Sequence, residues 1–159
     1  MPYLIDGHNL IPKLGLRLDS LDDEEELISR LQEFCRLRRL HAEVFFDGAP
    51  PGQAPRRTAG SVTAHFVRQG SSADAAIELQ LARMGKTVKN WTVVSSDRRV
   101  QQAARAVHAG VLSSEEFARE MSAAHSASKA VLKNEATLTP GEVEKWLDVF
   151  NQKKDRTRP

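Results

Sequence analysis

The chain has 159 residues, of which 40% are hydrophobic and 28% are charged, and its net charge is +2. This length fits one domain with a core, or one domain plus a short appendage. The apolar runs are far shorter than the roughly 20 residues that cross a bilayer, which excludes a membrane protein. The near-balanced charge means that any surface for nucleic acid must be local.

The N-terminal residues MPYLIDGHNL show neither a basic region nor a small-residue cleavage site. Nothing there indicates a secretory signal, so the expected compartment is the cytoplasm. The one cysteine, Cys35, cannot form a disulfide within the chain, which agrees with a reducing compartment. It lies in a Leu/Phe-rich helical pattern, where a packing role is favoured over a nucleophilic one.

Two apolar runs in the first third of the chain predict strands that end in an acidic turn. Residues 3–5 form the first run and stop at Asp6-Gly7, and residues 42–46 form the second and stop at Asp47-Gly48. A loop and a helix over residues 22–40 lie between them. That helix begins with five acidic residues and ends with arginines, an order that favours the helix dipole.

The rest of the first 121 residues continues the alternation of strands and helices. The expected elements are a mobile loop over 49–60, a strand over 61–67, a helix over 75–84 that packs through Ile77, Leu79, Leu81 and Met84, a strand over 91–94, a helix over 98–107, a short strand over 110–112 and a helix that begins near Ser113. Such alternation predicts an α/β fold with a central, mainly parallel sheet flanked by helices.

The C-terminal part is expected to be an appendage to a domain over residues 1–121. Residues 122–159 are interpreted as a linker followed by an amphipathic helix. The Ala-, Ser- and Lys-rich stretch over 122–136 is either a weakly structured tether or a marginal helix. A last helix over 139–150 carries an apolar stripe that includes Trp146, and this stripe needs a partner, which makes a homodimer an alternative to docking within the chain.

Four aspartates are predicted to meet at one edge of the sheet. Asp6, Asp47 and Asp97 each follow a predicted strand, and Asp74 begins a predicted helix. In open parallel sheets, ligands bind beyond the carboxyl ends of the strands. Carboxylates gathered there repel one another, and a divalent cation removes that cost. Oxygen ligands suit Mg²⁺ or Mn²⁺, which can activate water for phosphodiester hydrolysis.

Each aspartate also has an ordinary structural interpretation. Asp47 can belong to a plain turn, Asp74 can interact with a helix dipole, and Asp97 can cap the helix that follows it. Ser96 either orients Asp97, binds a phosphate or is merely a polar residue at a helix start. Cations near the predicted acidic end are candidate RNA-binding residues, with ordinary surface charge as the alternative: Lys13, Arg56, Arg57, Arg68, Arg98 and Arg99.

Four segments resemble a known family in their order and spacing: YLIDGHNLI, VFFDG, SSADAAI and VVSSDRRVQ. They are similar to the NYN domains of the YacP-like group, which are PIN-like ribonucleases. The resemblance covers residues 3 to 121, including LSSEEFAREM. It implies a PIN-like three-layer fold and a metal-dependent endoribonuclease. Ala75 departs from the pattern, because relatives often have a second polar or acidic residue there.

Carried over by position, Asp6, Asp74 and Asp97 resemble the metal-holding carboxylates of the family. Asn9 matches the asparagine of the DGxN motif and would hold the geometry of the site or reach a phosphate. Asp47 corresponds to the acid of the second strand. His8 is a tempting general base, but relatives often have Tyr there. The implied partners are RNA and, through it, the ribosome or RNA-processing machinery.

Three functions remain open at this point. The leading one is an Mg²⁺- or Mn²⁺-dependent endoribonuclease. The second is a catalytically inactive RNA-binding module or scaffold in an RNA-processing assembly. The third is a toxin-like PIN nuclease. A Rossmann-type nucleotide binder is disfavoured, because no Gly-rich phosphate loop follows the first strand.

Overall fold

A computed structural model describes residues 2–16 and 21–137 of the chain. Its contacts divide the chain into two units, Met1–Ser122 and Ala123–Pro159. The whole sheet belongs to the first unit. The predicted helix over 139–150, with the Trp146 stripe, lies outside the described residues.

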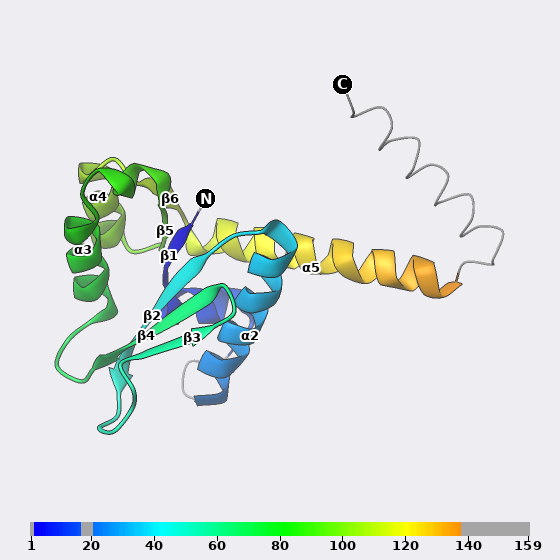
Figure 1. The fold of residues 1–159 in the computed structure, drawn as a ribbon, viewed down its shortest axis with the longest axis horizontal. Helices are drawn as coiled ribbons and strands as arrows, with labels where there is room; N and C mark the ends of the chain where they lie inside the picture. Colours follow the sequence, from blue (N-terminus) through cyan, green and yellow to red (C-terminus); the bar gives the residue numbers. More distant parts are fainter. Residues whose placement is uncertain (1, 17–20, 138–159) are drawn as a thin grey trace. The chain divides into compact units, whose positions relative to one another are not determined.

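Six strands form a single sheet in the first unit (Figure 1). The strands are β1 (Tyr3–Asp6), β2 (Ala42–Ala49), β3 (Arg56–Ala59), β4 (Val62–Arg68), β5 (Thr92–Val94) and β6 (Gly110–Leu112). Their order is β3-β4-β2-β1-β5-β6, and every neighbouring pair is parallel except the antiparallel pair β3–β4. The predicted α/β fold with a mainly parallel sheet is confirmed.

Helices cover both faces of this sheet. They are α1 (Gly7–Leu10), the 3₁₀ helix η1 (Ile11–Leu14), α2 (Leu21–Arg38), α3 (Ala73–Met84), the 3₁₀ helix η2 (Gly85–Asn90), α4 (Arg98–Ala106) and α5 (Ser114–Thr137). The pairs α1–β2, α2–β4, α3–β1 and α4–β5 are in contact. Figure 1 shows α3 and α4 on one side of the strands and α2 on the other, which gives three layers.

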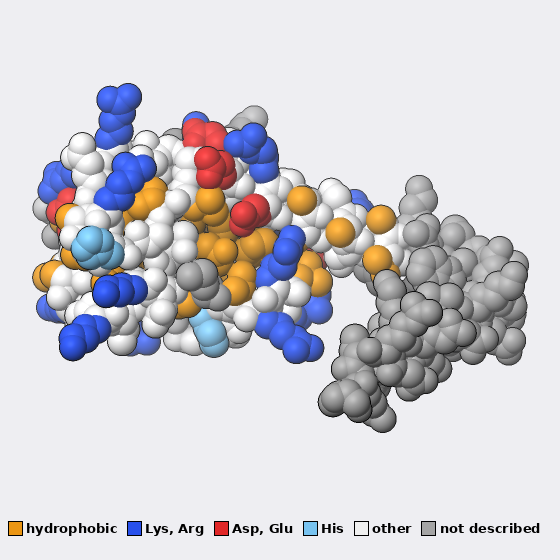
Figure 2. All heavy atoms as spheres, turned by 90° about the horizontal axis from the view of Figure 1, so that it is seen from above, with side chains coloured by type: hydrophobic (Ala, Val, Ile, Leu, Met, Phe, Trp, Pro, Cys, Tyr) orange, Lys and Arg blue, Asp and Glu red, His pale blue; other side chains and the backbone are white. Residues whose placement is uncertain are grey.

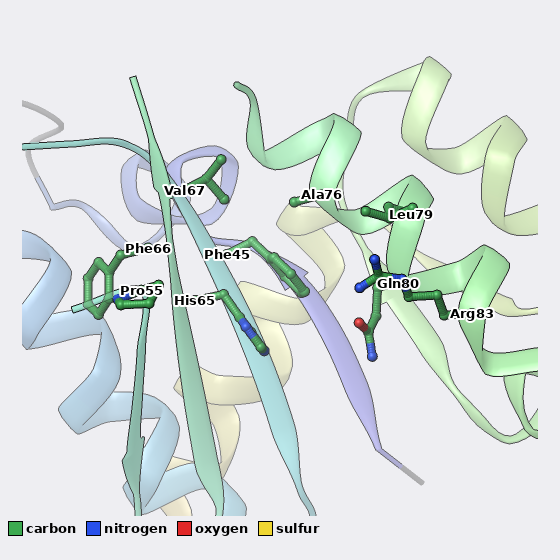
Figure 3. Close-up of a pocket in the computed structure, with 9 residues that line it drawn as sticks. All are labelled: Phe45, Pro55, His65, Phe66, Val67, Ala76, Leu79, Gln80 and Arg83. Carbon is green, nitrogen blue, oxygen red and sulfur yellow. The ribbon is translucent and has the colours of Figure 1, made fainter. Parts of the chain in front are cut away.

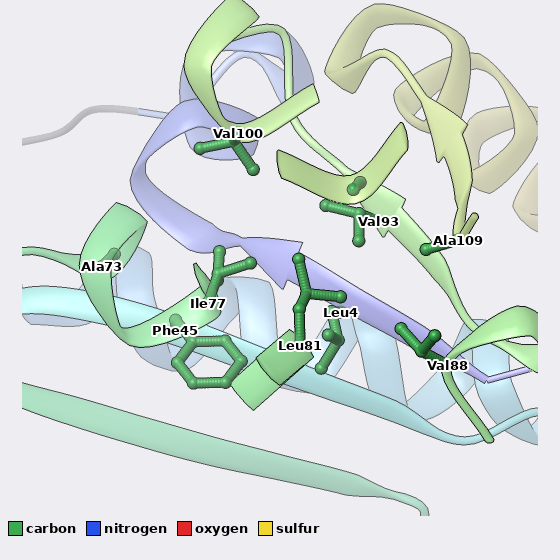
Figure 4. Close-up of a cluster of buried hydrophobic side chains, with 10 residues drawn as sticks. Leu4, Phe45, Ala73, Ile77, Leu81, Val88, Val93, Val100 and Ala109 are labelled. Atoms are coloured by element: carbon green, nitrogen blue, oxygen red, sulfur yellow. The ribbon is translucent and has the colours of Figure 1, made fainter. Parts of the chain in front are cut away.

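The core on the α3 and α4 side is built from alternate residues of the central strands. Leu4, Phe45 and Val93 pack there against helix residues that include Ile77 and Val100 (Figure 4). On the α2 side, the rings of Phe34 and Phe117 meet edge to face at 5.3 Å. Burial of this apolar surface fixes the strands, and therefore the positions of the side chains at their carboxyl ends.

The segment after β1 differs from the expected turn and loop. The chain enters α1 directly at Gly7 and continues into η1. Gly7 permits this because a Cβ there would lie 2.4 Å from the Phe46 ring and 2.9 Å from the Phe45 carbonyl oxygen. A residue with a side chain would push α1 away from β2. The glycine was interpreted as a turn former, but its role is close approach.

The prediction that the second strand ends in a turn at Asp47-Gly48 is also wrong, because β2 continues through both residues to Ala49. The pairing of β2 with β4 shifts register between Phe46 and Ala49, and Gly48 has a φ of 71°. The Asp-Gly pair therefore forms an irregularity inside a strand. A bulge and a turn use the same residue types, so the sequence did not separate them.

Residues 49–60 are not wholly a loop, because their last part is β3. This strand lies at the edge of the sheet and is exposed on both faces, apart from the partly buried Ala59. It therefore lacks the apolar alternation that marks a half-buried strand. Leu79 was expected to pack in the core, but it is 53% exposed. Of the two alternatives for the stretch over 122–136, the structure has the helix, which is part of α5.

Candidate active site

Asp6, Asp74 and Asp97 lie together at the carboxyl edge of the sheet. Asp6 is the last residue of β1, Asp74 is in the first turn of α3, and Asp97 is the N-cap of α4. The Asp74 side chain is within hydrogen-bonding reach of both other carboxyl groups. Three elements that are distant in sequence therefore bring three carboxyl groups to this edge, where Asp74 interacts with each of the other two.

The pKa of Asp6 is raised to about 7. Burial is the main cause, because only 6% of the residue is exposed and the carboxylate loses hydration. The negative charge of Asp74 raises it further, whereas the Asn9 backbone N–H donates to the Asp6 carboxyl and lowers it. Burial and then the charge of Asp97 likewise raise the pKa of Asp74. When all three carboxyl groups of Asp6, Asp74 and Asp97 are ionised, they carry more negative charge than this poorly hydrated environment favours.

Asn9 joins the end of β1 to two later segments. Its side-chain oxygen accepts hydrogen bonds from the Ser96 backbone N–H at 2.9 Å and from the Ser114 hydroxyl at 2.6 Å. The Ser96 hydroxyl accepts from the Ser114 N–H at 3.0 Å and donates to Glu115 at 2.5 Å. Asn9 and Ser96 therefore hold together the segments around the aspartates.

Ser95 connects Asp6 to Asp97. Its hydroxyl lies 3.5 Å from Asp6 Oδ2 and accepts a hydrogen bond from the Asp97 backbone N–H at 3.1 Å. The Ser95 carbonyl oxygen accepts from the Gln101 amide at 2.8 Å, and Asp97 Oδ1 accepts from the Arg99 N–H at 2.9 Å. Asp97 thus has the capping role, and one of its oxygens is used in it.

Asp47 is paired with His8, and its negative charge also contributes to the raised pKa of Asp6. His8 Nδ1 lies 2.5 Å from Asp47 Oδ1, and His8 Nε2 lies 2.8 Å from Glu24 Oε1. The hydrogen bond to Glu24 raises the pKa of His8, burial opposes this, and Asp47 adds to the increase. A histidine with both ring nitrogens directed at carboxylates favours the charged form, which is a poor general base.

The six predicted RNA-binding cations divide into two sets. Lys13 binds Glu115 at 2.9 Å, Arg57 binds Glu25 through two 2.7 Å hydrogen bonds, and Arg99 binds Glu78. The other three cations make no salt bridge to described residues: Arg56, Arg68 and Arg98. Arg56 begins β3 and Arg68 ends β4, which places both toward the carboxyl edge of the parallel strands.

No broad basic surface is present on the face seen in Figure 2, where Lys and Arg side chains are spread around the margin and apolar side chains lie between them. This distribution agrees with the near-zero net charge of the chain. Attraction of a polyanion would therefore depend on individual cations near the acidic edge.

The carboxylates of this edge can be compared with the ligands that a divalent cation needs. Among the residues that the structure describes, no three His, Cys, Asp or Glu side chains converge to hold a metal ion. Mg²⁺ does not need such a cage, because it is usually held by one or two carboxylates and completed by water and substrate phosphates. The buried Asp6 and its neighbour Asp74 provide oxygen ligands and an excess of negative charge, so the residues fit.

Several residues of the site were missed by sequence reasoning. Glu24, Ser95 and Glu115 contact His8, Asp6 and Ser96, respectively, and Ser114 contacts Asn9. Ser114 and Glu115 stand in a sequence that resembles a helix cap, which gave a signal for a helix start but none for a site. Glu24 belongs to the acidic first turn of α2, where a dipole role explained it fully.

This fold and its acidic edge define an α/β domain of the kind that binds ligands beyond the ends of parallel strands. A family model described as the YacP-like NYN domain matches residues 3–157. The chain belongs to this family, which is one of ribonuclease-type domains.

Solved structures with the same fold include two of Rae1 (YacP) from Bacillus subtilis. One, of a W164L mutant, is 22% identical, has a TM-score of 0.70, and covers 88% of this chain and 86% of its own. The other is 21% identical, also has a TM-score of 0.70, and covers 97% of this chain and 92% of its own. No curated protein sequence matches the chain significantly. No helix of the described part is long and apolar enough to cross a membrane.

Proposed function

We propose that this protein is an endoribonuclease that hydrolyses RNA phosphodiester bonds with Mg²⁺ or Mn²⁺ at the edge formed by Asp6, Asp74 and Asp97. The observation that carries the proposal is the burial of Asp6 beside Asp74, which raises the pKa of Asp6 to about 7. Fold stability alone does not favour this arrangement, because it places like charges together in a poorly hydrated position. Membership of a ribonuclease-type family supports RNA as the substrate.

Asp6 and Asp74 are the residues that would hold the metal, and Asp97 would complete the site through the oxygen that does not cap α4. When bound, such a cation lowers the pKa of water and stabilises charge on the phosphorus. Asn9 is a positioning residue, because its backbone N–H donates to the Asp6 carboxyl and its side-chain oxygen accepts a hydrogen bond from the Ser96 backbone N–H. Asp47 contributes charge from its place beside His8 and is proposed as a weaker, outer ligand.

The three cations without a salt bridge would receive the substrate phosphates. Arg56, Arg68 and Arg98 can each turn toward a phosphate without breaking an ion pair in the described structure. Arg99 and Arg57 would first have to leave Glu78 and Glu25, respectively. We therefore rank the unpaired cations above the paired ones as RNA contacts.

The test is cleavage of a single-stranded RNA by purified wild-type protein and by Asp6→Asn, each with Mn²⁺ and with EDTA. Loss of a metal ligand is expected to lower the rate by about 100-fold or more. Glu26→Gln is the matched control, because Glu26 is an exposed acid whose salt bridge among the described residues is with Arg30 on its own helix. Its rate should equal that of the wild type.

Two results would count against the nuclease. Equal cleavage by Asp6→Asn and wild type would show that the activity belongs to another site or a contaminant. RNA binding without cleavage by the wild type, at any Mn²⁺ concentration, would favour the RNA-binding module. The same assay therefore separates the leading function from its main alternative.

A further inference from the structure

A cavity of about 220 Å³ lies on the α3 side of the sheet, outside the group of aspartates (Figure 3). Its lining includes Phe45 and His65 from the strands and Leu79, Gln80 and Arg83 from α3. The cavity exists because α3 packs over β1 and β2, so that side chains of the next strand, β4, lie beside the helix. Strand side chains form one wall and α3 forms another.

Two stacked rings line this cavity. Phe45 and His65 are paired across β2 and β4, and their rings stack with centroids 4.5 Å apart and planes 10° apart. His65 Nε2 also lies 2.7 Å from a carboxylate oxygen of Glu43, which fixes the orientation of the imidazole. The His65 ring is fixed by the stacked Phe45 ring and by the Glu43 carboxylate, and it is therefore pre-organised to stack on a planar ligand.

The cavity adjoins the acidic edge. Phe45 is the register partner of Asp6 on the neighbouring strand, about 5 Å away. Ala76, which also lines the cavity, follows Asp74 by two residues on α3. The cavity therefore begins near the acidic edge and continues along α3 through Leu79, Gln80 and Arg83.

We propose that this cavity binds one base of single-stranded RNA, next to the phosphate held at the aspartates. The inference rests on RNA as the substrate of the proposed function. The volume is below the roughly 300–1,000 Å³ of pockets for drug-sized molecules, so it suits a base better than a whole nucleotide. The base stacks on the face of the His65 imidazole that Phe45 does not cover, and its edge meets the polar ends of Gln80 and Arg83.

The exposure of Leu79 is accounted for by the same ligand. Leu79 is a large hydrophobic side chain that is 53% exposed, although it lines the cavity. A bound base would cover its apolar surface while leaving the backbone phosphates in solvent. A planar, partly apolar ligand would therefore explain why an exposed leucine lies beside the stacked rings of His65 and Phe45.

The experiment compares two ligands of equal length and charge: a short single-stranded RNA and the same ribose-phosphate chain without bases. Affinities are measured by fluorescence anisotropy in EDTA, so that no cleavage occurs. The wild type should bind the base-containing strand roughly tenfold more tightly. His65→Ala and Leu79→Ala should each reduce this ratio, and His65→Phe should retain most of it because the ring face remains.

Val131→Ala is the matched control, because Val131 is 57% exposed and does not line the cavity. Leu79→Ala protects the test against misfolding, since an exposed side chain contributes little to the core. Equal affinity for the two strands, or no binding of either, would overturn the inference. So would an unchanged ratio in both His65→Ala and Leu79→Ala.

Cleavage with Mn²⁺ is measured separately on the same proteins. Base-dependent binding without cleavage would support the base-binding cavity and contradict the proposed nuclease function. Cleavage with equal affinity for the two strands would do the opposite. The two proposals can therefore fail independently.

Discussion

The Asn9 side-chain oxygen accepts a hydrogen bond from the Ser114 hydroxyl at 2.6 Å, which joins α1 to the first turn of α5. These residues are 105 positions apart, and Ser114 is fully buried. Asn9→Ala should lower the free energy of unfolding by about 1–3 kcal/mol, because it leaves a buried hydroxyl without its acceptor. A double-mutant cycle with Ser114→Ala, followed by urea denaturation, should give a coupling of about 1 kcal/mol. Additive effects would contradict the contact.

The raised pKa of Asp6 predicts an unusual dependence of stability on pH. The unfolded chain releases the Asp6 proton near pH 3.8, whereas the folded chain keeps it until about pH 7. The protonated folded form is thus favoured at low pH, and stability is lost as the pH rises from about 4 to 7. Relative to wild type, Asp6→Asn should therefore become more stable over this interval, by roughly 1–2 kcal/mol at pH 8 without metal.

Mn²⁺ should reverse that difference. A divalent cation neutralises the carboxylates of the folded wild type, so the wild-type melting temperature should rise with Mn²⁺ more at pH 8 than at pH 6. Asp6→Asn should respond less at both values. Thermal melts of both proteins over a Mn²⁺ series test this, and an equal response in the two proteins would argue against Asp6 as a ligand.

The division of the cations into paired and unpaired sets predicts their effects on RNA affinity. Arg68→Ala should weaken binding and reduce the slope of log K against log salt by about 0.7, the value for one phosphate contact on a single strand. Arg99→Ala should do less, because its guanidinium is held by Glu78. Glu78→Gln should release Arg99 and strengthen binding. A larger effect from Arg99→Ala than from Arg68→Ala would invert this ranking.

Cys35 should be chemically silent in the folded protein. It is 1% exposed, and burial raises the pKa of its thiol to about 11. Because the thiolate is the reactive form, a thiol reagent at pH 8 should label Cys35 only in denaturant. Rapid labelling of the native protein would show that α2 opens locally.

The sequence predicted the parts of the site that depend on local pattern. Apolar runs stop at Asp6 and just before Asp97, and parallel strands place such positions at one edge. The contacts among these residues were not predictable. Asn9 follows β1 and Ser114 follows β6, and they meet because β1, β5 and β6 are successive strands of the sheet. No spacing in a single sequence encodes that strand order.

Errors occurred where one residue type serves two purposes. Gly7 allows close approach to Phe46, Gly48 allows a bulge, and both looked like turn formers. Leu79 fitted the apolar spacing of a helix, yet α3 packs through Ile77 and Leu81 and leaves it exposed. Its exposure became informative only beside the cavity that it lines.

The edge strand β3 has a consequence for handling the protein. Its outer side has no neighbouring strand in the described sheet, and an unpaired edge can add a strand from another copy. Arg56 and Arg57 place positive charge on this strand, where it repels an identical edge. Replacing these arginines therefore removes a barrier to self-association as well as charge available to a nucleic acid. Light scattering of each arginine variant should precede any measurement of its affinity, because a loss of free protomer would imitate a loss of contact.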